Sequence, residues 1–188
     1  LLLEEGGSDL LGNTTGLTAL YVRLTDLIKE LGLPGIDVAH NNNDDTKALE
    51  DLVIQVRRDI LRQVHKVNSG HPGGSLGCAE FFVALFQEIM DRNDGFDMNG
   101  HEEDLFFLSN GHISPVFYSV LARSGYFPVE ELNTFRLLNS RLQGHPTTHE
   151  GLPGIRVASG SLGQGISVAT GAALAKKLNK EEHLVYTL

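Results

Sequence analysis

The sequence predicts an α/β domain in which a mostly parallel sheet is flanked by helices. Two short apolar runs, Asp104–Ser109 (DLFFLS) and His183–Leu188 (HLVYTL), have the length and composition of buried parallel strands. Segments with helical periodicity alternate with these runs, which favours parallel strands joined by helices. A glycine-rich turn with Gly160, Gly163 and Gly165 precedes a run of small residues that suits a closely packed helix.

Composition limits the class of protein. The chain has 188 residues, enough for one domain with a sizeable core. The net charge is −9 and no basic run is present, so we expect no nucleic-acid partner. No apolar run is long enough to span a bilayer, so we expect no membrane partner. Cys78 is the single cysteine, which rules out an intrachain disulfide and fits a reducing, cytoplasmic location.

Residues 1–43 are interpreted as an N-terminal extension of unassigned role. Apolar residues between Leu17 and Leu31 recur at helical spacing, and Gly32 and Pro34 end that helix. It is either a short amphipathic helix that packs on the domain or a helix that binds a partner. The start of the chain is apolar and then acidic, so we do not expect a secretory signal. We place the domain itself at residues 44–188.

The first part of the domain is predicted to be helical. A helix follows Asp44 or Asp45 as its N-cap and ends before Asn68. Its apolar face is formed by Leu49, Leu52, Val53, Val56, Ile60, Leu61 and Val64. His71–Gly77 (HPGGSLG) is predicted to be a loop, and the next helix extends to about Met90. Its inward residues are Ala79, Phe82, Val83, Phe86, Ile89 and Met90.

The first strand is followed directly by a turn that contains His112. Ser114 suits the cap of the following helix, Pro115 its first position, and Gly125 its end. His112 therefore lies on a strand-to-helix turn, at the carboxyl edge of the sheet where ligands bind in open α/β folds. A further helix is predicted over Pro128–Leu138.

Histidine follows glycine at three positions, His71, His112 and His145, and each lies in a predicted loop. We expect these three Gly-His steps to meet at the glycine-rich turn. Neutral imidazole can hydrogen-bond to a phosphate or a hydroxyl group, and it can move protons near pH 7. A helix that begins in the turn directs its positive end toward the same place, which favours an anion such as a phosphate or diphosphate.

Other kinds of site are less well supported. His145 and His149 are four residues apart, but Pro146 argues against a helix there, so we do not expect a zinc site. The turn GSLGQG matches neither the dinucleotide-binding pattern nor the P-loop, and its glycines could serve close helix packing alone. No G-x-S-x-G is present, and Cys78 is interpreted as a buried structural thiol.

Four motifs in order, SGHPGGSLG, LSNGHISP, QGHPTTHEGLPG and ASGSLGQGI, resemble the amino-terminal, diphosphate-binding region of transketolase. The resemblance covers about residues 45–188 and is nearest to the N-terminal subunit of split bacterial transketolases. It implies thiamine diphosphate with Mg²⁺ or Ca²⁺, and transfer of a two-carbon ketol unit between sugar phosphates. It also implies a C-terminal transketolase subunit, or a pyrimidine-binding domain, and a homo-oligomer.

The resemblance also implies roles for individual residues. His112 would bind the diphosphate, and Gly160, Ser161 and Leu162 would line the cofactor near its aminopyrimidine. Ser161 stands where many members of the family have proline. His71 and His145 would be catalytic, facing the donor sugar and its intermediate.

The metal ligands of the family follow the strand that matches HLVYTL, so none is assigned within this chain. We therefore expect the fold to be incomplete at its carboxyl end and the isolated chain to be inactive. Two alternatives are a deoxyxylulose-phosphate synthase or other thiamine-dependent ketol transferase, and a non-catalytic assembly fragment.

Overall fold

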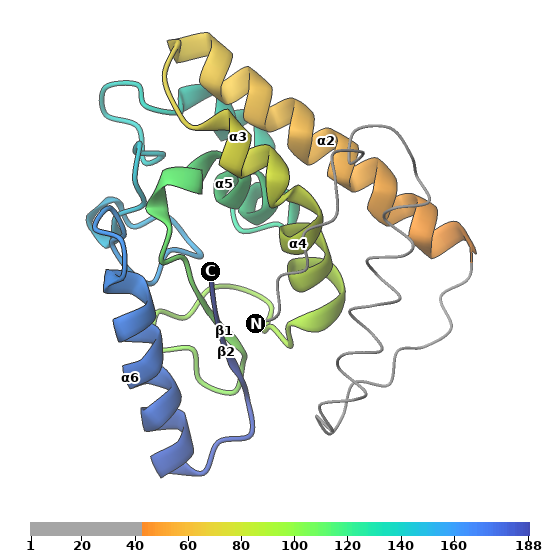
Figure 1. Cartoon of the computed structure of the whole chain (residues 1–188). Helices are drawn as coiled ribbons and strands as arrows, with labels where there is room; N and C mark the ends of the chain where they lie inside the picture. The colour runs from red at the N-terminus through yellow and green to blue at the C-terminus, as the bar shows by residue number, and fades with distance from the viewer. Residues whose placement is uncertain (1–42) are drawn as a thin grey trace, which may run out of the picture. The chain divides into compact units, whose positions relative to one another are not determined.

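The computed structural model describes residues 43–188 (Figure 1). The helix predicted over residues 17–31 lies outside the described residues, as does the proposed extension except for Asn43, which is the first residue of α2. The regular elements are α2 (Asn43–Val67), α3 (Pro72–Gly77), α4 (Ala79–Ala84), β1 (Leu105–Phe107), α5 (Ser114–Arg123), α6 (Gln164–Asn179) and β2 (Val185–Thr187). A π-helical turn, Leu85–Ile89, continues α4, and 3₁₀ turns span Gly111–Ile113, Val129–Thr134 and Thr148–Glu150.

The two predicted strands pair in parallel, as the sequence indicates. Phe106 of β1 lies opposite Tyr186 of β2 in the register. Leu105 N–H donates to Leu184 O at 2.9 Å, and Ser109 N–H donates to Leu188 O at 2.7 Å. All three residues of β1 are buried, but those of β2 are only half-buried, so the prediction of a second buried strand is wrong. Within the described residues, β2 pairs with β1 alone.

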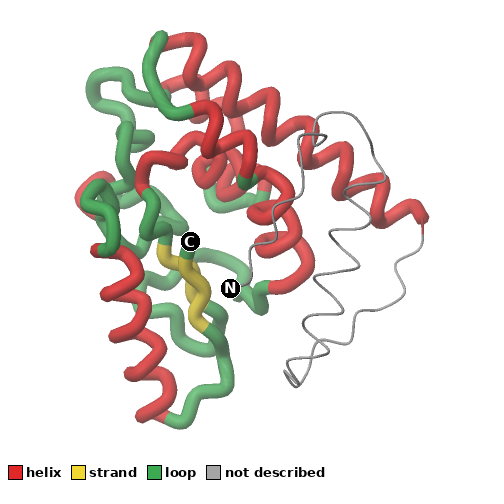
Figure 2. Tube along the Cα trace, viewed as in Figure 1, coloured by secondary structure: helices red, strands yellow, loops and turns green. Residues whose placement is uncertain are grey.

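Helices cover both faces of β1 because its side chains alternate. The Phe106 ring lies 5.4, 5.5 and 5.2 Å from the rings of Phe82, Phe86 and Phe117, in the core formed with α4 and α5. Leu105 and Phe107 point the other way and pack with Ala169 of α6. Figures 1 and 2 show α6 on one side of the strands and α2 to α5 on the other. The predicted α/β architecture is confirmed.

The long helix α2 begins slightly earlier than predicted. It starts at Asn43, so Asp44 and Asp45 lie in its first turn instead of capping it. The carboxylate of Asp45, in the first turn, still interacts favourably with the helix dipole. The helix ends at Val67, as predicted. Its inward face matches the prediction except at Leu61, whose side chain is 52% exposed.

Two predicted elements differ from the structure. His71–Gly77 contains the short helix α3, because Pro72 has the fixed φ that suits a first turn. Pro128–Leu138 forms only the 3₁₀ turn Val129–Thr134. The chain leaves that turn because Phe135 has extended ψ and Arg136 has a positive φ of 57°. Arg136 N–H then donates to Leu142 O at 2.8 Å, which replaces a further helical hydrogen bond.

The ends of α5 are mostly as predicted. Pro115 lies in the first turn and Gly125 follows the helix with a φ of +85°. Ser114, however, does not cap α5, because Ile113 holds the cap position. The Ser114 hydroxyl instead donates to Gly144 O at 2.7 Å, an interaction that matters for the site described below.

Cys78 and the helices that follow it carry no sign of special chemistry. The Cys78 side chain is half-buried, not fully buried as predicted. Burial, with a smaller effect of Glu80, raises the pKa of the thiol, which opposes formation of the reactive thiolate. Ile89 and Met90 are only partly buried.

None of the helices within residues 43–188 has the length and apolar character needed to cross a bilayer.

Candidate functional site

The three Gly-His steps meet at the carboxyl end of β1. His112 lies between the other two histidines, with ring centroids 5.1 Å from His71 and 4.8 Å from His145. Both pairs are arranged edge to face. His71 and His145 are exposed, whereas His112 is half-buried. The expected convergence of the three residues is confirmed. His71 and His145 are 74 positions apart in the sequence, so the fold brings distant loops together.

Close approach of two loops at Gly111 builds the centre of this site. Gly111 is buried, and a Cβ placed on it would lie 1.4 Å from Ser159 O. Only glycine permits this approach. Ser159 N–H also donates to Pro146 O at 3.1 Å. One residue, Ser159, therefore joins the loop of His112 to the loop of His145 and to the glycine-rich turn.

Helix α5 fixes the loop that carries His145. Ser114 Oγ donates to Gly144 O, and Tyr118 Oη donates to Gln143 O at 2.8 Å. Burial raises the pKa of the Tyr118 phenol, so the hydroxyl stays protonated and remains a donor. His145 is therefore exposed on a segment whose backbone is held from beneath.

The glycine-rich turn starts α6, as predicted, but its glycines have different tasks. Gly163 is the N-cap residue, with a φ of 88°. Gly165 is buried against the end of β1, where an added Cβ would lie 2.4 Å from Ser109 Cα. Gly160 is exposed, and its nearest neighbour would be the His145 ring at 3.6 Å. Packing thus explains Gly165, whereas Gly160 leaves space beside His145, and a Cβ added at Gly163 would meet no atom within 4 Å.

The start of α6 offers fewer unpaired N–H groups than the sequence suggests. Gln164 N–H donates to Ser161 O at 3.2 Å, and Ile166 N–H donates to Ser109 Oγ at 3.0 Å. The first bond closes the turn itself, and the second docks the helix to the carboxyl end of β1. The positive end of the helix dipole still points toward the site, but amide donation to an anion is reduced.

The electrostatic setting favours neutral imidazole at His145. Desolvation has the largest effect in lowering the pKa of His145, followed by the charges of His112, Arg136 and His71. At pH 7 the ring is therefore uncharged and can both donate and accept a hydrogen bond. The Nδ1 atom of His112 is buried without a hydrogen-bond partner among the described residues, so it has unused hydrogen-bonding capacity.

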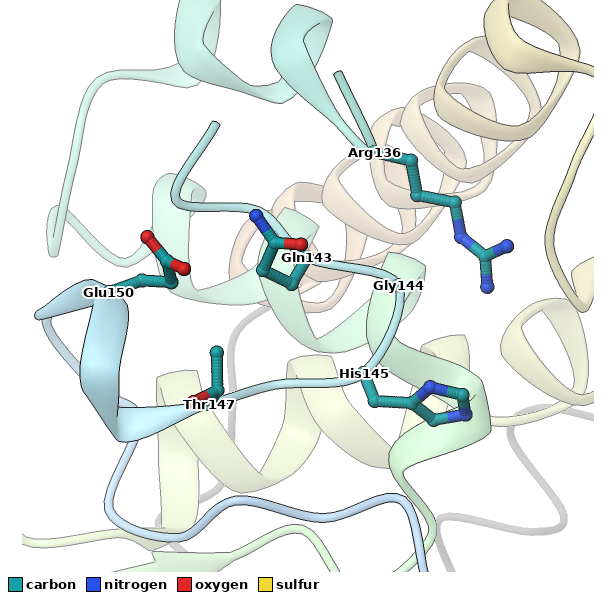
Figure 3. Close-up of a pocket in the computed structure, with 6 residues that line it drawn as sticks. All are labelled: Arg136, Gln143, Gly144, His145, Thr147 and Glu150. Atoms are coloured by element: carbon teal, nitrogen blue, oxygen red, sulfur yellow. The ribbon is translucent and has the colours of Figure 1, made fainter. Parts of the chain in front are cut away.

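An open cavity of about 560 Å³ adjoins His145 (Figure 3). It is lined by Arg136, Gln143, Gly144, His145, Thr147 and Glu150. Arg136 was not identified from the sequence, because it lies in a segment predicted to be helical and belongs to no glycine motif. Across residues 43–188, no group of three or more histidine, cysteine or acidic side chains is placed to hold a metal ion.

The fold and the site define a ligand-binding α/β domain whose site is at the carboxyl edge of a parallel sheet. Residues 49–184 match the family model described as "Transketolase, thiamine diphosphate binding domain". The chain therefore belongs to the transketolase family, and the matched region is its thiamine diphosphate-binding domain.

Curated relatives agree with this assignment. Transketolase 2 of Escherichia coli is 40% identical over 129 residues, which cover 68% of this chain and 19% of that protein. The transketolase of Dictyostelium discoideum is 40% identical over 151 residues, covering 77% of this chain and 22% of that protein. The chain thus spans about a fifth of the length of these relatives.

Solved transketolase structures share the fold. The enzyme from Leishmania mexicana has a TM-score of 0.66 and 32% identity, covering 74% of this chain and 22% of that chain. A Pichia stipitis transketolase in complex with sedoheptulose-7-phosphate has a TM-score of 0.64 and 36% identity, covering 74% of this chain and 21% of that chain.

The described residues fit the cofactor for which the domain is named. His112 has a ring nitrogen without a partner, suited to a hydrogen bond with a polar group. Gly160 leaves the space beside His145 unfilled. Leu162, two residues after Gly160, is 72% exposed and offers an apolar surface to a ring. The polar and apolar parts of thiamine diphosphate thus each have suitable residues nearby.

Proposed function

We propose that this chain supplies the diphosphate-binding part of a transketolase, which transfers a two-carbon ketol unit between sugar phosphates. The observation that carries the proposal is the meeting of His71, His112, His145 and Gly160 at the carboxyl end of β1. A sugar phosphate bound to the related Pichia stipitis enzyme supports the choice of substrate class.

Each residue has a task that its position supports. Half-buried His112 hydrogen-bonds to the diphosphate, and Gly160, Ser161 and Leu162 line the cofactor near its aminopyrimidine. The exposed rings of His71 and His145 bind and orient the donor sugar, and neutral His145 exchanges a proton with a sugar hydroxyl. When bound, thiamine diphosphate supplies the carbanion-stabilising chemistry, and the protein supplies position and electrostatics.

The proposal includes further components. A divalent cation, Mg²⁺ or Ca²⁺, would neutralise the diphosphate through oxygen ligands outside residues 43–188. A pyrimidine-binding domain or C-terminal subunit would complete the cofactor site, in a homo-oligomeric, cytoplasmic enzyme. Kinetic tests therefore require a complete enzyme. A suitable one carries residues 49–184 in place of the matching segment of Escherichia coli transketolase 2, and is called the grafted enzyme below.

We expect His112→Ala to raise the thiamine diphosphate concentration needed for half-maximal activity of the grafted enzyme. A hydrogen bond to a charged group is worth about 1.5–3 kcal/mol, so the increase should be about tenfold or more. Activity measured against cofactor concentration checks this. His65→Ala, at an exposed position of α2, is the control. An unchanged cofactor requirement in a folded His112→Ala enzyme would contradict the assigned role.

We expect His71→Ala and His145→Ala to impair handling of the sugar and to spare the cofactor. Each should lower kcat or raise the KM for the donor, because both rings are exposed and are proposed to bind the sugar, whereas the diphosphate is assigned to half-buried His112. Steady-state kinetics at saturating thiamine diphosphate, followed by a cofactor titration, separate the two effects. Loss of cofactor binding with normal donor kinetics would reverse the assignment.

A further inference from the structure

One arginine links the two exposed histidine loops. Arg136 Nη1 donates to Ser69 Oγ at 2.6 Å, and Ser69 lies two residues before His71. The same guanidinium lies against Gly144, the residue before His145. A Cβ on Gly144 would be 2.8 Å from Arg136 Nε and Cζ and 2.9 Å from Nη2. Figure 3 shows the Arg136 side chain extending past Gly144 on the side of the His145 ring.

The backbone of Arg136 is held in an unusual conformation. Its φ of 57° is in the left-handed region, which is unfavourable for a residue with a side chain. The Arg136 N–H donates to Leu142 O, and the guanidinium lies 5.4 Å from the ring of buried Phe135. These contacts direct the side chain toward the two loops.

Stability alone does not account for an arginine at this position. The Nε atom of Arg136 is buried and has no hydrogen-bond partner among residues 43–188. Burying an unpaired donor of a charged group is unfavourable. Gly144 is needed for the guanidinium to fit, so the glycine of one Gly-His step serves the arginine. A buried arginine with an unpaired donor is expected where the side chain holds neighbouring functional residues in place, here the loops of His71 and His145, rather than where it stabilises the fold.

We propose that Arg136 is a positioning residue that sets the distance and orientation of His71 and His145 by bracing Ser69 and Gly144. This inference rests on the proposed function, because it assumes that these histidines bind the donor sugar. The planar guanidinium hydrogen-bonds to Ser69 with one edge while its plane lies against Gly144. Lysine keeps the charge but lacks this planar, multiply donating group, so it should not replace arginine.

The charge of Arg136 has a second, separable effect. It contributes to the lowered pKa of His145, together with desolvation and the charges of His112 and His71. Glu150 is the carboxylate that lines the same cavity. Removing the positive charge should therefore raise the pKa of His145, whereas Arg136→Lys should leave it low. The two substitutions distinguish the charge of the residue from its shape.

The test combines NMR of the full chain with kinetics of the grafted enzyme. Arg136→Lys, Arg136→Gln and Gly144→Ala are compared with Arg58→Gln, which changes an exposed arginine of α2. We expect all three to shift the ring resonances of both His71 and His145, and only Arg136→Gln to raise the pKa of His145 in a pH titration. In the grafted enzyme each should raise the donor KM about fivefold, the effect of one lost hydrogen bond, with the cofactor requirement unchanged.

The two arms separate failure of this inference from failure of the proposed function. Unchanged His71 and His145 resonances in folded Arg136→Lys and Gly144→Ala chains would overturn the positioning role, whatever the kinetics. Shifted resonances with normal donor kinetics would overturn the link to the sugar. If His71→Ala and His145→Ala also leave the donor kinetics unchanged, the proposed function itself fails. Arg136→Lys retains the positive charge and the aliphatic part of the side chain, so the positioning role can be tested with this variant if Arg136→Gln does not fold.

Discussion

Replacing Gly111 with alanine is expected to separate the histidine loops and to lower the free energy of unfolding by about 3 kcal/mol or more. The new Cβ would lie 1.4 Å from Ser159 O and 2.5 Å from Ser159 C. Both groups belong to the backbone, so no rotation of a side chain can relieve the clash. Moving Ser159 away would stretch its hydrogen bond to Pro146 O, and moving Gly111 would displace the end of β1.

Denaturant unfolding of the full chain measures this effect. Gly171→Ala is the matched control, because it lies within α6 and an added Cβ would meet no atom within 4 Å. Alanine there should stabilise the helix by up to about 1 kcal/mol. A Gly111→Ala chain as stable as the original, with unchanged His112 and His145 ring resonances, would show that the loop contact does not organise the site.

Replacing Gly160 with valine is expected to abolish thiamine diphosphate binding and to leave the fold intact. The atoms nearest to a Cβ on Gly160 would belong to the His145 side chain, at 3.6–3.8 Å, which is ordinary van der Waals contact. The branched side chain would instead occupy the space that the proposal gives to the cofactor. Gly160→Val is therefore expected to lose cofactor binding and keep its stability, whereas Gly111→Ala is expected to lose stability.

Calorimetry of the grafted enzyme measures the loss of binding, and circular dichroism measures the fold. Gly160→Ala provides an intermediate size and should weaken binding less than valine. Global unfolding of Gly160→Val would favour the alternative in which the glycine serves packing alone. Normal binding by a folded Gly160→Val enzyme would remove Gly160 from the cofactor site.

The sequence predicts those parts of the fold that local patterns determine. The strands follow from two short apolar runs, and the end of α2 follows from Asn68, which has a positive φ of 47°. The half-buried state of β2 was not predicted, because burial depends on which segments lie next to a strand. The helix predicted over Pro128–Leu138 failed for a similar reason: the hydrogen bond of Arg136 to Leu142 is made outside the helical pattern.

The histidine site was predictable only in outline. His71, His112 and His145 share a Gly-His pattern, so their types and spacing indicated a common site. Gly111 and Ser159, which are in contact, are 48 positions apart in the sequence. No local sequence pattern reveals a contact over that separation. Arg136 was missed because its role depends on Ser69 and Gly144, which reach it only in the folded chain.

The central claim is that thiamine diphosphate binds beside the histidine cluster, and NMR titration of the full chain tests it most directly. Thiamine diphosphate and Mg²⁺ would be added to an isotope-labelled chain while backbone and ring resonances are followed. We expect no ketol-transfer activity and weak binding, because a helix dipole and hydrogen bonds from the histidines each contribute only about 1–3 kcal/mol. The largest shifts should occur at His112 and Gly160–Leu162. Shifts confined to other residues, or none at millimolar cofactor, would contradict the account.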